Sequence, residues 1–394
     1  MERIGIYGGT FDPIHIGHIQ GAKYAQKMLS LDRVLLLPDR QPPHKQLTDR
    51  SASAENRLEM VRLAVDGEPG VEVCDLTFRR EGSAYACDTV EVLRGMYPEA
   101  QLTYLMGADM FLSFLNWREP DRIWKHASLA VLCRGGAGEM DKLTHQKMRL
   151  EDLGARVELL DNPVNTISST MIRRMLPLRC AGEHLNGSVL KYILDHGLYG
   201  TNRDLQGLSI EALQDTVVSL LKPNRVAHVL GCAETSAELA RRWGADETNA
   251  RRAGLLHDIT KAMDGPLQLT LCREYGIVLD NFSSQNPKTL HALTGSLVAD
   301  RIFGENDAVI SAIRSHTTGK ANMNLLEKII YVADYMEPNR DFPGVEELRS
   351  LAFSDIDKAL KLGLTMTLEM LRQQKRQISP ESQSALRWLE EHGV

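Results

Sequence analysis

Short apolar runs recur through the first 160 residues, and each ends in glycine, proline or a polar turn. Helical patterns lie between them, as at residues 54–65 and 88–96. Nearly continuous apolar strands that alternate with helices predict a parallel sheet covered on both faces, which is an α/β Rossmann-like fold. Ligands of such sheets bind beyond the carboxyl ends of the strands. The expected strands lie within residues 3–7, 33–38, 102–109, 129–136 and 156–163.

The pattern changes after Tyr199. Residues 199–209 are rich in glycine, asparagine and serine and predict a linker or turn. From Ser209 onward, apolar residues recur at helical spacing, as in residues 226–243 and 324–336. We therefore expect two domains, an α/β domain at 1–202 and an all-α domain at 203–394.

The composition argues against several classes of function. The net charge is −6, and acidic side chains outnumber basic ones in both halves, which disfavours nucleic acid as a partner. The six cysteines form no CxxC pair, so we expect reduced thiols. No signal-peptide pattern and no apolar run near 18 residues is evident, which predicts a cytoplasmic protein without membrane contact. The composition is compatible with a homo-oligomer.

The stretch YGGTFDPIHIGHI, residues 7–19, follows the first expected strand. Gly8 and Gly9 allow a sharp turn and a close approach of the backbone to a ligand. A helix that begins near residues 16–17 directs free N–H groups to the same place, which suits an anion. His15 and His18 share one face of such a helix and can donate hydrogen bonds to phosphoryl oxygens. The motif therefore predicts a phosphate site for phosphoryl or nucleotidyl transfer.

A second phosphate-binding pattern is ISSTMIR, residues 167–173. Its hydroxyl side chains precede an expected helix, where hydroxyls and N–H groups can cradle a phosphate. Arg173 on that helix can add a bidentate contact. Alone, such a pattern is usually a helix cap, and it becomes specific when it accompanies the two histidines.

Together these motifs resemble the HxGH nucleotidyltransferase superfamily. PPHK at residues 42–45 and GADMFLSFLNW at 107–117 are similar to bacterial nicotinate-nucleotide adenylyltransferases, over about residues 1–200. The resemblance implies transfer of AMP from ATP to nicotinate mononucleotide, with Mg²⁺ on the triphosphate. It implies catalytic roles for His15, His18, Lys45 and Arg173. It implies stacking of Trp117 on the pyridine ring, with Lys45 near the reacting phosphates. The implied ATP-binding residues are Gly8, Gly9, Thr10, Phe11, His15, His18, Asp109, Arg134, Ile167, Ser168, Ser169, Thr170 and Arg173. Adenylyl or cytidylyl transfer to a different phosphate is the alternative.

The second half contains histidines and aspartates in the order H, HD, H, H, D. Imidazole and carboxylate without thiolate suit Fe, Mn, Co, Ni or Zn rather than Ca. Apolar neighbours would bury the adjacent His-Asp pair, and a metal ion would offset the cost of burying the carboxylate. The candidate ligands are His228, His257, Asp258, His291, His316 and Asp334.

This ordered set resembles the HD-domain metallohydrolases. RVAHVLG, AGLLHDITK, SHTTG and YVADYMEPNR are more closely similar to the HD family that hydrolyses diadenosine tetraphosphate symmetrically, over about residues 208–351. The resemblance implies that His228, His257, Asp258 and Asp334 hold a metal. It also implies that His291 and His316 hold a second metal or face phosphate. Lys261 would be a catalytic residue that meets substrate phosphate, and Arg340 would bind the substrate. A nucleotide-sensing module, or hydrolysis of a mononucleotide or a guanosine alarmone, are the alternatives.

Overall fold

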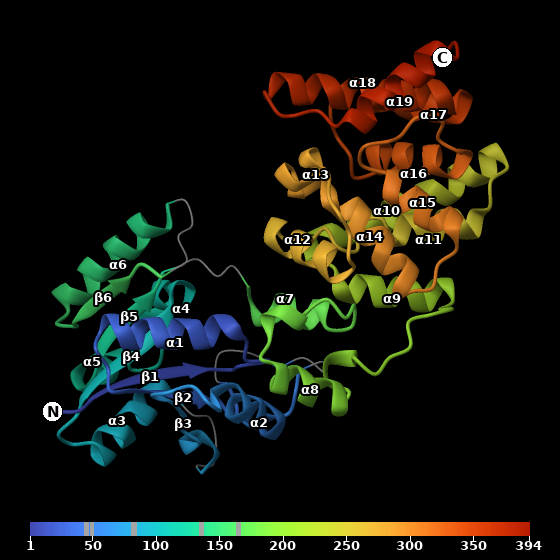
Figure 1. The fold of residues 1–394 in the computed structure, drawn as a ribbon. Helices are drawn as coiled ribbons and strands as arrows, with labels where there is room; N and C mark the ends of the chain where they lie inside the picture. Colours follow the sequence, from blue (N-terminus) through green and yellow to red (C-terminus); the bar gives the residue numbers. More distant parts are fainter. Residues whose placement is uncertain (43–46, 48–50, 80–84, 134–137, 163–166) are drawn as a thin grey trace. The chain divides into compact units, whose positions relative to one another are not determined.

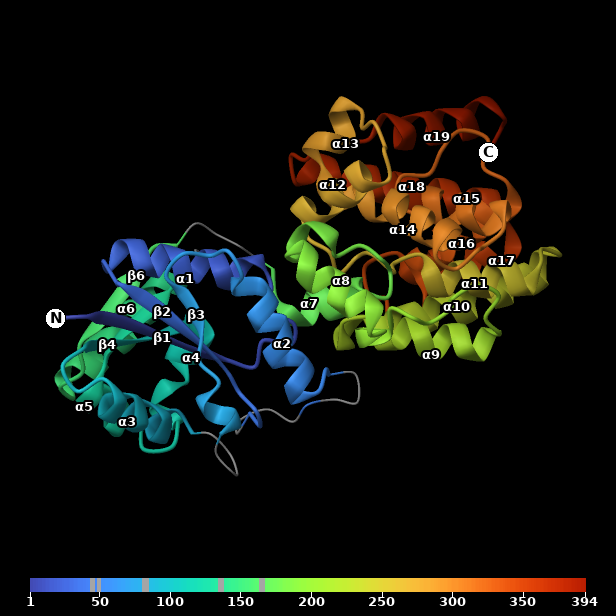
Figure 2. The same ribbon diagram turned by 60° about the horizontal axis from the view of Figure 1, so that its bottom comes forward.

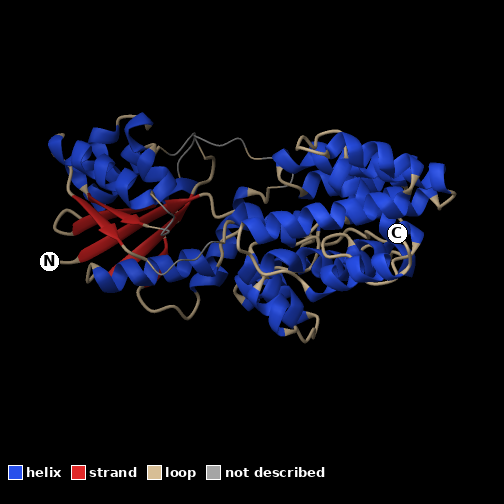
Figure 3. Cartoon of the chain, turned by 90° about the horizontal axis from the view of Figure 1, so that it is seen from above, coloured by secondary structure: helices blue, strands red, loops and turns tan. Residues whose placement is uncertain are grey.

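The computed structural model describes residues 1–42, 47, 51–79, 85–133, 138–162 and 167–394 (Figure 1). The chain divides into two compact units, Met1–Arg203 and Asp204–Val394. The first unit contains all the described strands, and the second is helical (Figure 3). The predicted fold class, a Rossmann-like α/β domain followed by a helical domain, is confirmed.

The strands of the first unit form one parallel sheet in the order β3-β2-β1-β4-β5-β6. The chain starts at the centre with β1, moves outward through β2 and β3, and then crosses back to β4. Neighbours β1 and β4 therefore lie where the strand order reverses, which is where such sheets bind ligands. The strands are β1 (Arg3–Gly9), β2 (Arg33–Pro38), β3 (Val71–Val73), β4 (Gln101–Gly107), β5 (Ser128–Leu132) and β6 (Val157–Leu160).

Helices cover both faces of this sheet (Figure 3). Ile4 and Ile6 on β1 and Leu35 and Leu37 on β2 point to one face, because alternate residues of a strand share a face. They pack there with Phe111 and other apolar side chains in one buried core. The helices of this unit are α1 (Ile16–Met28), α2 (Ala54–Val65), α3 (Ala86–Met96), α4 (Ala108–Leu112), α5 (Pro120–His126), α6 (Glu139–Asp152), α7 (Ser169–Met175) and α8 (Gly187–Asp195).

One strand departs from the sequence-based expectation. The sequence predicted five strands, and the structure adds β3 at the edge of the sheet. β3 has only three residues, Val71–Val73, and pairs with β2. A run of three residues with a central exposed glutamate carries no apolar pattern that a sequence window can detect.

The second unit is built from packed helices around a buried polar centre. α10 lies along α11 and also packs against α16, while α14 packs against α15 (Figure 2). Among the described helices, none is long and apolar enough to cross a membrane. The helices are α9 (Ile210–Leu220), α10 (Pro223–Trp243), α11 (Glu247–Leu256), α12 (Gly265–Glu274), α13 (Asn281–Gln285), α14 (Leu290–Arg301), α15 (Asp307–Ser315), α16 (Leu325–Met336), α17 (Val345–Ser354), α18 (Ile356–Gln373) and α19 (Pro380–Glu391).

Candidate functional site

A cavity of about 430 Å³ opens in the first unit at the carboxyl ends of β1 and β4. The size of the cavity is in the range of small-molecule sites. Gly8 and Tyr104 both line it, and a Cβ at Gly8 would lie 3.0 Å from the hydroxyl of Tyr104, so a larger residue would crowd this part of the wall. Predicted site residues that line it are Gly8, Gly9, Thr10, Phe11, His15, His18, Asp109, Trp117 and Ile167.

The two histidines stand at the start of α1, as expected. His15 is the N-cap residue, and its backbone N–H donates to Nδ1 of His18 at 3.2 Å. The two rings lie 3.7 Å apart between centroids, and Phe11 packs edge-on against His18. Because Nδ1 of a neutral His18 accepts this bond, its Nε2 carries the proton. In this tautomer the Nε2 of His18 is a hydrogen-bond donor at the N-terminus of α1.

The serine-rich segment at α7 is joined to the loop that follows β1. Ser168 caps α7 by accepting from the N–H of Met171. Ser169 donates its hydroxyl to the carbonyl of Pro13 at 2.9 Å. Arg173 donates to the carbonyl of Asp12 at 2.5 Å and to the hydroxyl of Thr170 at 3.2 Å. These residues therefore bring two predicted phosphate-binding segments together, although Arg173 has protein partners here.

Trp117 and Asp109 border the same cavity from the loop and helix after β4. Trp117 packs edge-on against Tyr104 and Phe114, with centroid distances of 6.2 and 5.1 Å. Asp109 lies in the first turn of α4, directly after the strand. Two further predicted site residues, Lys45 and Arg134, lie outside the described residues.

Arg57 on α2 is a residue of this region that the sequence patterns did not indicate. Its side chain is fully buried and donates to three backbone carbonyls, of Thr10, Asp39 and Arg40, at 2.6–3.0 Å. It thus ties the loop after β1 to the loop after β2. A helical arginine is normally an exposed residue, so nothing in the local sequence distinguishes it.

Asp39 lines the cavity, and its carboxyl group has a raised pKa of about 6. Burial raises this pKa from 3.8, and the nearby Arg57 guanidinium offsets part of the rise. Above pH 6 the folded protein keeps a poorly solvated carboxylate, whereas the unfolded chain has no such cost. The group should therefore lower the free energy of unfolding by about 2–3 kcal/mol at pH 8, progressively less as the pH falls through 6, and not at all below the unfolded pKa.

We expect Asp39→Asn to be more stable than the wild type at pH 8, and the difference in the free energy of unfolding to fall below about 1 kcal/mol at pH 4. Urea unfolding followed by tryptophan fluorescence at several pH values measures the difference. Asp66→Asn changes an exposed carboxyl group at the end of α2 and serves as the control. A stability difference that is constant with pH, or that grows toward low pH, would contradict the assignment.

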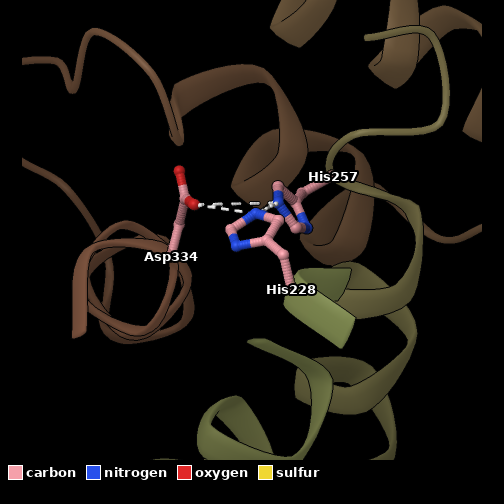
Figure 4. A group of neighbouring side chains, drawn as sticks. All are labelled: His228, His257 and Asp334. Carbon is pink, nitrogen blue, oxygen red and sulfur yellow. Dashed lines mark hydrogen bonds and ion pairs between the residues drawn. The ribbon is translucent and has the colours of Figure 1, made fainter. Parts of the chain in front are cut away.

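The second candidate site is the polar centre of the second unit, which collects all six predicted donors. His228 lies on α10, His291 on α14 and Asp334 on α16. His257 and His316 are the C-cap residues of α11 and α15, and Asp258 follows His257. Figure 4 shows His228, His257 and Asp334 converging from separate segments. Two groups have ligand atoms within 4.8 Å of one another, namely His228, His257 and Asp334, and His257, Asp258 and His316.

All four imidazoles are oriented in the same way. Nδ1 of each ring is held by an acceptor outside the cluster at 2.6–3.1 Å. Each neutral ring therefore carries its proton on Nδ1 and presents the lone pair of Nε2 inward. The acceptors are Glu337 Oε1 for His228, and the carbonyls of Gly254, Lys288 and Ile313 for His257, His291 and His316.

The inward nitrogens face one another in two pairs. Nε2 of His228 lies 3.2 Å from Nε2 of His257, and the same distance separates His291 from His316. Two lone pairs at this distance repel unless a cation lies between or beside them. Burial also lowers the pKa of His316 to about 4, so the ring is neutral at pH 7 and free to act as a ligand.

Asp258 lies between the two histidine pairs. Its Oδ2 is 3.6 Å from Nε2 of both His228 and His257, and its Oδ1 is 3.4 Å from His291 and 3.7 Å from His316. Both oxygens are buried, and their partners are cations: Oδ2 forms an ion pair with Arg225, and Oδ1 lies 3.5 Å from Nζ of Lys261. A buried carboxylate that lies among inward imidazole lone pairs fits one or two divalent transition-metal ions.

Cationic and hydroxyl groups surround these donors. Arg225 forms an ion pair with Asp258, and Lys261 donates to Nε2 of His291 at 2.8 Å. Arg340, predicted to meet phosphate, pairs with Asp334 at 2.6 Å. The hydroxyl of Thr317 lies 3.0 Å from Nε2 of His291. Arg225 and Thr317 lie inside the motifs RVAHVLG and SHTTG, but neither was predicted as a site residue.

Comparison with known proteins agrees with this division of the chain. Residues 6–175 match the Cytidylyltransferase-like family, and residues 225–339 match the HD domain family. A solved structure from Clostridium acetobutylicum, described as a predicted HD superfamily hydrolase involved in NAD metabolism, is 35% identical. The match covers 47% of this chain and 98% of that chain, with a TM-score of 0.46.

Two curated relatives match the first half of the chain along nearly their whole length. The probable nicotinate-nucleotide adenylyltransferase of Neisseria meningitidis serogroup C is 36% identical over 201 residues, which are 50% of this chain and 99% of the relative. The protein of the same description from Dictyoglomus thermophilum is 36% identical over 198 residues, again 50% and 99%. Through its first half the chain belongs to the nicotinate-nucleotide adenylyltransferase family, and this half is followed by an HD domain.

Proposed function

We propose that the first unit transfers AMP from ATP to nicotinate mononucleotide. The observation that carries this proposal is the cavity at the ends of β1 and β4, which has His15 and His18 at the start of α1. Relatives that span the whole unit bear the name of this activity, which supports the same acceptor. In NAD biosynthesis the products would be deamido-NAD and pyrophosphate.

The chemistry requires charge stabilisation more than a protein nucleophile. A phosphate oxygen of nicotinate mononucleotide attacks the α-phosphorus of ATP, and the bond from that phosphorus to the pyrophosphate oxygen breaks. We assign His18 and the N–H groups of α1 to the oxygens that gain charge in this step, with His15 beside them. Trp117 offers a flat face for the pyridine ring, and Asp109 is assigned to the nucleoside. We further propose that Mg²⁺ binds the triphosphate of ATP and that Lys45 lies near the reacting phosphates. The remaining residues assigned to the triphosphate are Arg134, Ser168, Thr170 and Arg173.

An acceptor screen tests this assignment. The full chain is incubated with ATP, Mg²⁺ and nicotinate mononucleotide, and deamido-NAD and pyrophosphate are measured by chromatography. Parallel reactions replace nicotinate mononucleotide by nicotinamide mononucleotide or another phosphate monoester, and ATP by CTP. We expect nicotinate mononucleotide with ATP to give the highest kcat/KM. A higher value for another pair would favour the alternative member of the superfamily.

We propose that the second unit is a metal-dependent phosphohydrolase. The carrying observation is the set of four inward Nε2 atoms around Asp258, together with Asp334. A metal ion held there would activate water and neutralise phosphate charge. Arg225, Lys261 and Arg340 lie beside the donors and are suited to hold a polyphosphate.

For its substrate we propose diadenosine tetraphosphate, cleaved at the central bridge. The motifs RVAHVLG, AGLLHDITK, SHTTG and YVADYMEPNR support this choice. Water adds to one of the two central phosphorus atoms, the central P–O bond breaks, and two ADP molecules form. Product chromatography with Mn²⁺, Co²⁺ or Fe²⁺ tests it. ATP and AMP in equal amounts would refute symmetrical cleavage, and absence of hydrolysis of any nucleotide would favour a sensing module.

A further inference from the structure

We propose that Glu337 is a positioning residue that orients His228 for metal binding. The inference rests on the proposed metal site of the second unit and adds a residue outside its ligand set. Glu337 is the C-cap residue of α16, three residues after Asp334, and its side chain is 1% exposed. A buried carboxylate at this place needs partners that compensate its charge.

The carboxylate of Glu337 is held by donors on both oxygens. Oε1 accepts from Nδ1 of His228 at 3.1 Å. Oε2 accepts from the backbone N–H and from the side-chain amide of Asn339, each at 2.8 Å. The backbone carbonyl of Glu337 accepts from Arg349 at 3.0 Å, so the segment itself is anchored to α17. Glu337 therefore has one defined orientation, which points an acceptor at His228.

Gly231 on α10 provides the space for this carboxylate. A Cβ at Gly231 would lie 2.5 Å from Oε2 of Glu337 and 3.1 Å from the side-chain nitrogen of Asn339. A glycine inside a helix costs about 1 kcal/mol relative to alanine. The glycine lies three residues after His228, so the helix that supplies the ligand also makes room for its partner.

The consequence for His228 is specific. A carboxylate acceptor on Nδ1 keeps the proton on that nitrogen, fixes the plane of the ring and makes Nε2 a stronger ligand. His257, His291 and His316 have backbone carbonyls in the equivalent position. His228 is thus the one among these four imidazoles whose partner can be changed by mutation.

The test measures Co²⁺ binding by the full chain after removal of bound metal with a chelator. Dissociation constants come from competition with a chelating dye, and the visible spectrum of bound Co²⁺ reports the ligand geometry. Glu337→Gln keeps the shape but turns an NH₂ group toward either His228 or the two Asn339 donors. We expect one Co²⁺ binding step to weaken about 10–100-fold, with a changed spectrum.

Gly231→Ala is the second variant and leaves Glu337 in the sequence. Its Cβ must displace the carboxylate, so we expect weaker Co²⁺ binding although alanine favours the helix. Gly363→Ala on α18 is the matched control, because its Cβ would lie 3.4 Å from the ring of Tyr331, an ordinary contact. Glu327→Gln is the control for loss of a buried carboxylate, since Glu327 is buried and pairs with Lys320 at 2.7 Å.

The outcomes distinguish the positioning role of Glu337 from the existence of the metal site. Weaker Co²⁺ binding in Glu337→Gln and Gly231→Ala, with binding unchanged in both controls, supports the positioning role. Unchanged binding in both test variants, or an equal loss in Glu327→Gln, overturns it and leaves the metal site intact. Failure of the wild-type chain to bind Co²⁺ overturns the metal site and this inference together.

Discussion

An Asp258→Ala variant is expected to lose hydrolysis of diadenosine tetraphosphate by more than about 100-fold and to retain adenylyl transfer. Asp258 presents one oxygen to His228 and His257 and the other to His291 and His316. Its removal takes a carboxylate ligand from the proposed metal site, next to both histidine pairs. Loss of a direct ligand lowers activity more than loss of a residue that only orients a ligand. Arg225 and Lys261 would also lose their anionic partner.

Both activities are measured on the same preparation of the full chain, by chromatography of nucleotides. Asp300→Ala removes an exposed carboxylate from α14 and should leave both activities near the wild-type level. Bound metal is measured in parallel, since the variant should also retain less of it. Normal hydrolysis by Asp258→Ala would exclude this cluster as the hydrolytic site.

A His18→Ala variant is expected to lower kcat for adenylyl transfer by about 10²–10³, with a much smaller change in the KM for nicotinate mononucleotide. We assign the Nε2–H group of His18 to an oxygen that gains charge as pyrophosphate leaves, and such a contact strengthens in the transition state. Steady-state kinetics with each substrate varied in turn separates the two effects. A kcat near the wild-type value would contradict the assigned role.

His18 also accepts the backbone N–H of His15, so its removal affects the start of α1. His18→Gln separates the two roles, because glutamine at this helix position can accept the same N–H in a capping box. We expect His18→Gln to recover thermal stability relative to His18→Ala while its turnover stays low. Recovery of turnover together with stability would show that the histidine acts only as a cap.

The sequence alone determined the features that depend on neighbours a few residues apart. The apolar runs at 3–7 and 33–38 predicted strands β1 and β2, and the spacing of His15 and His18 predicted their common face at the start of α1. These predictions succeeded because strand and helix periods act over one or two turns of chain. The six candidate metal donors were also visible in the sequence, because histidines and aspartates that lie beside apolar segments are typical of metal sites.

Tertiary structure alone decided which of these groups meet and what holds them. His228 and Glu337 are 109 residues apart, and Arg57 reaches carbonyls 17 to 47 residues away. Glu337 lies inside the motif YVADYMEPNR, but the motif does not show that it contacts His228. Arg57 belongs to no local pattern, since an arginine near a helix end is usually a solvated side chain. The inward direction of the four imidazoles likewise depends on acceptors supplied by the packing of separate helices. Which side chains meet across such sequence separations depends on how whole helices and strands pack. Periodicity and motif spacing therefore cannot predict these contacts.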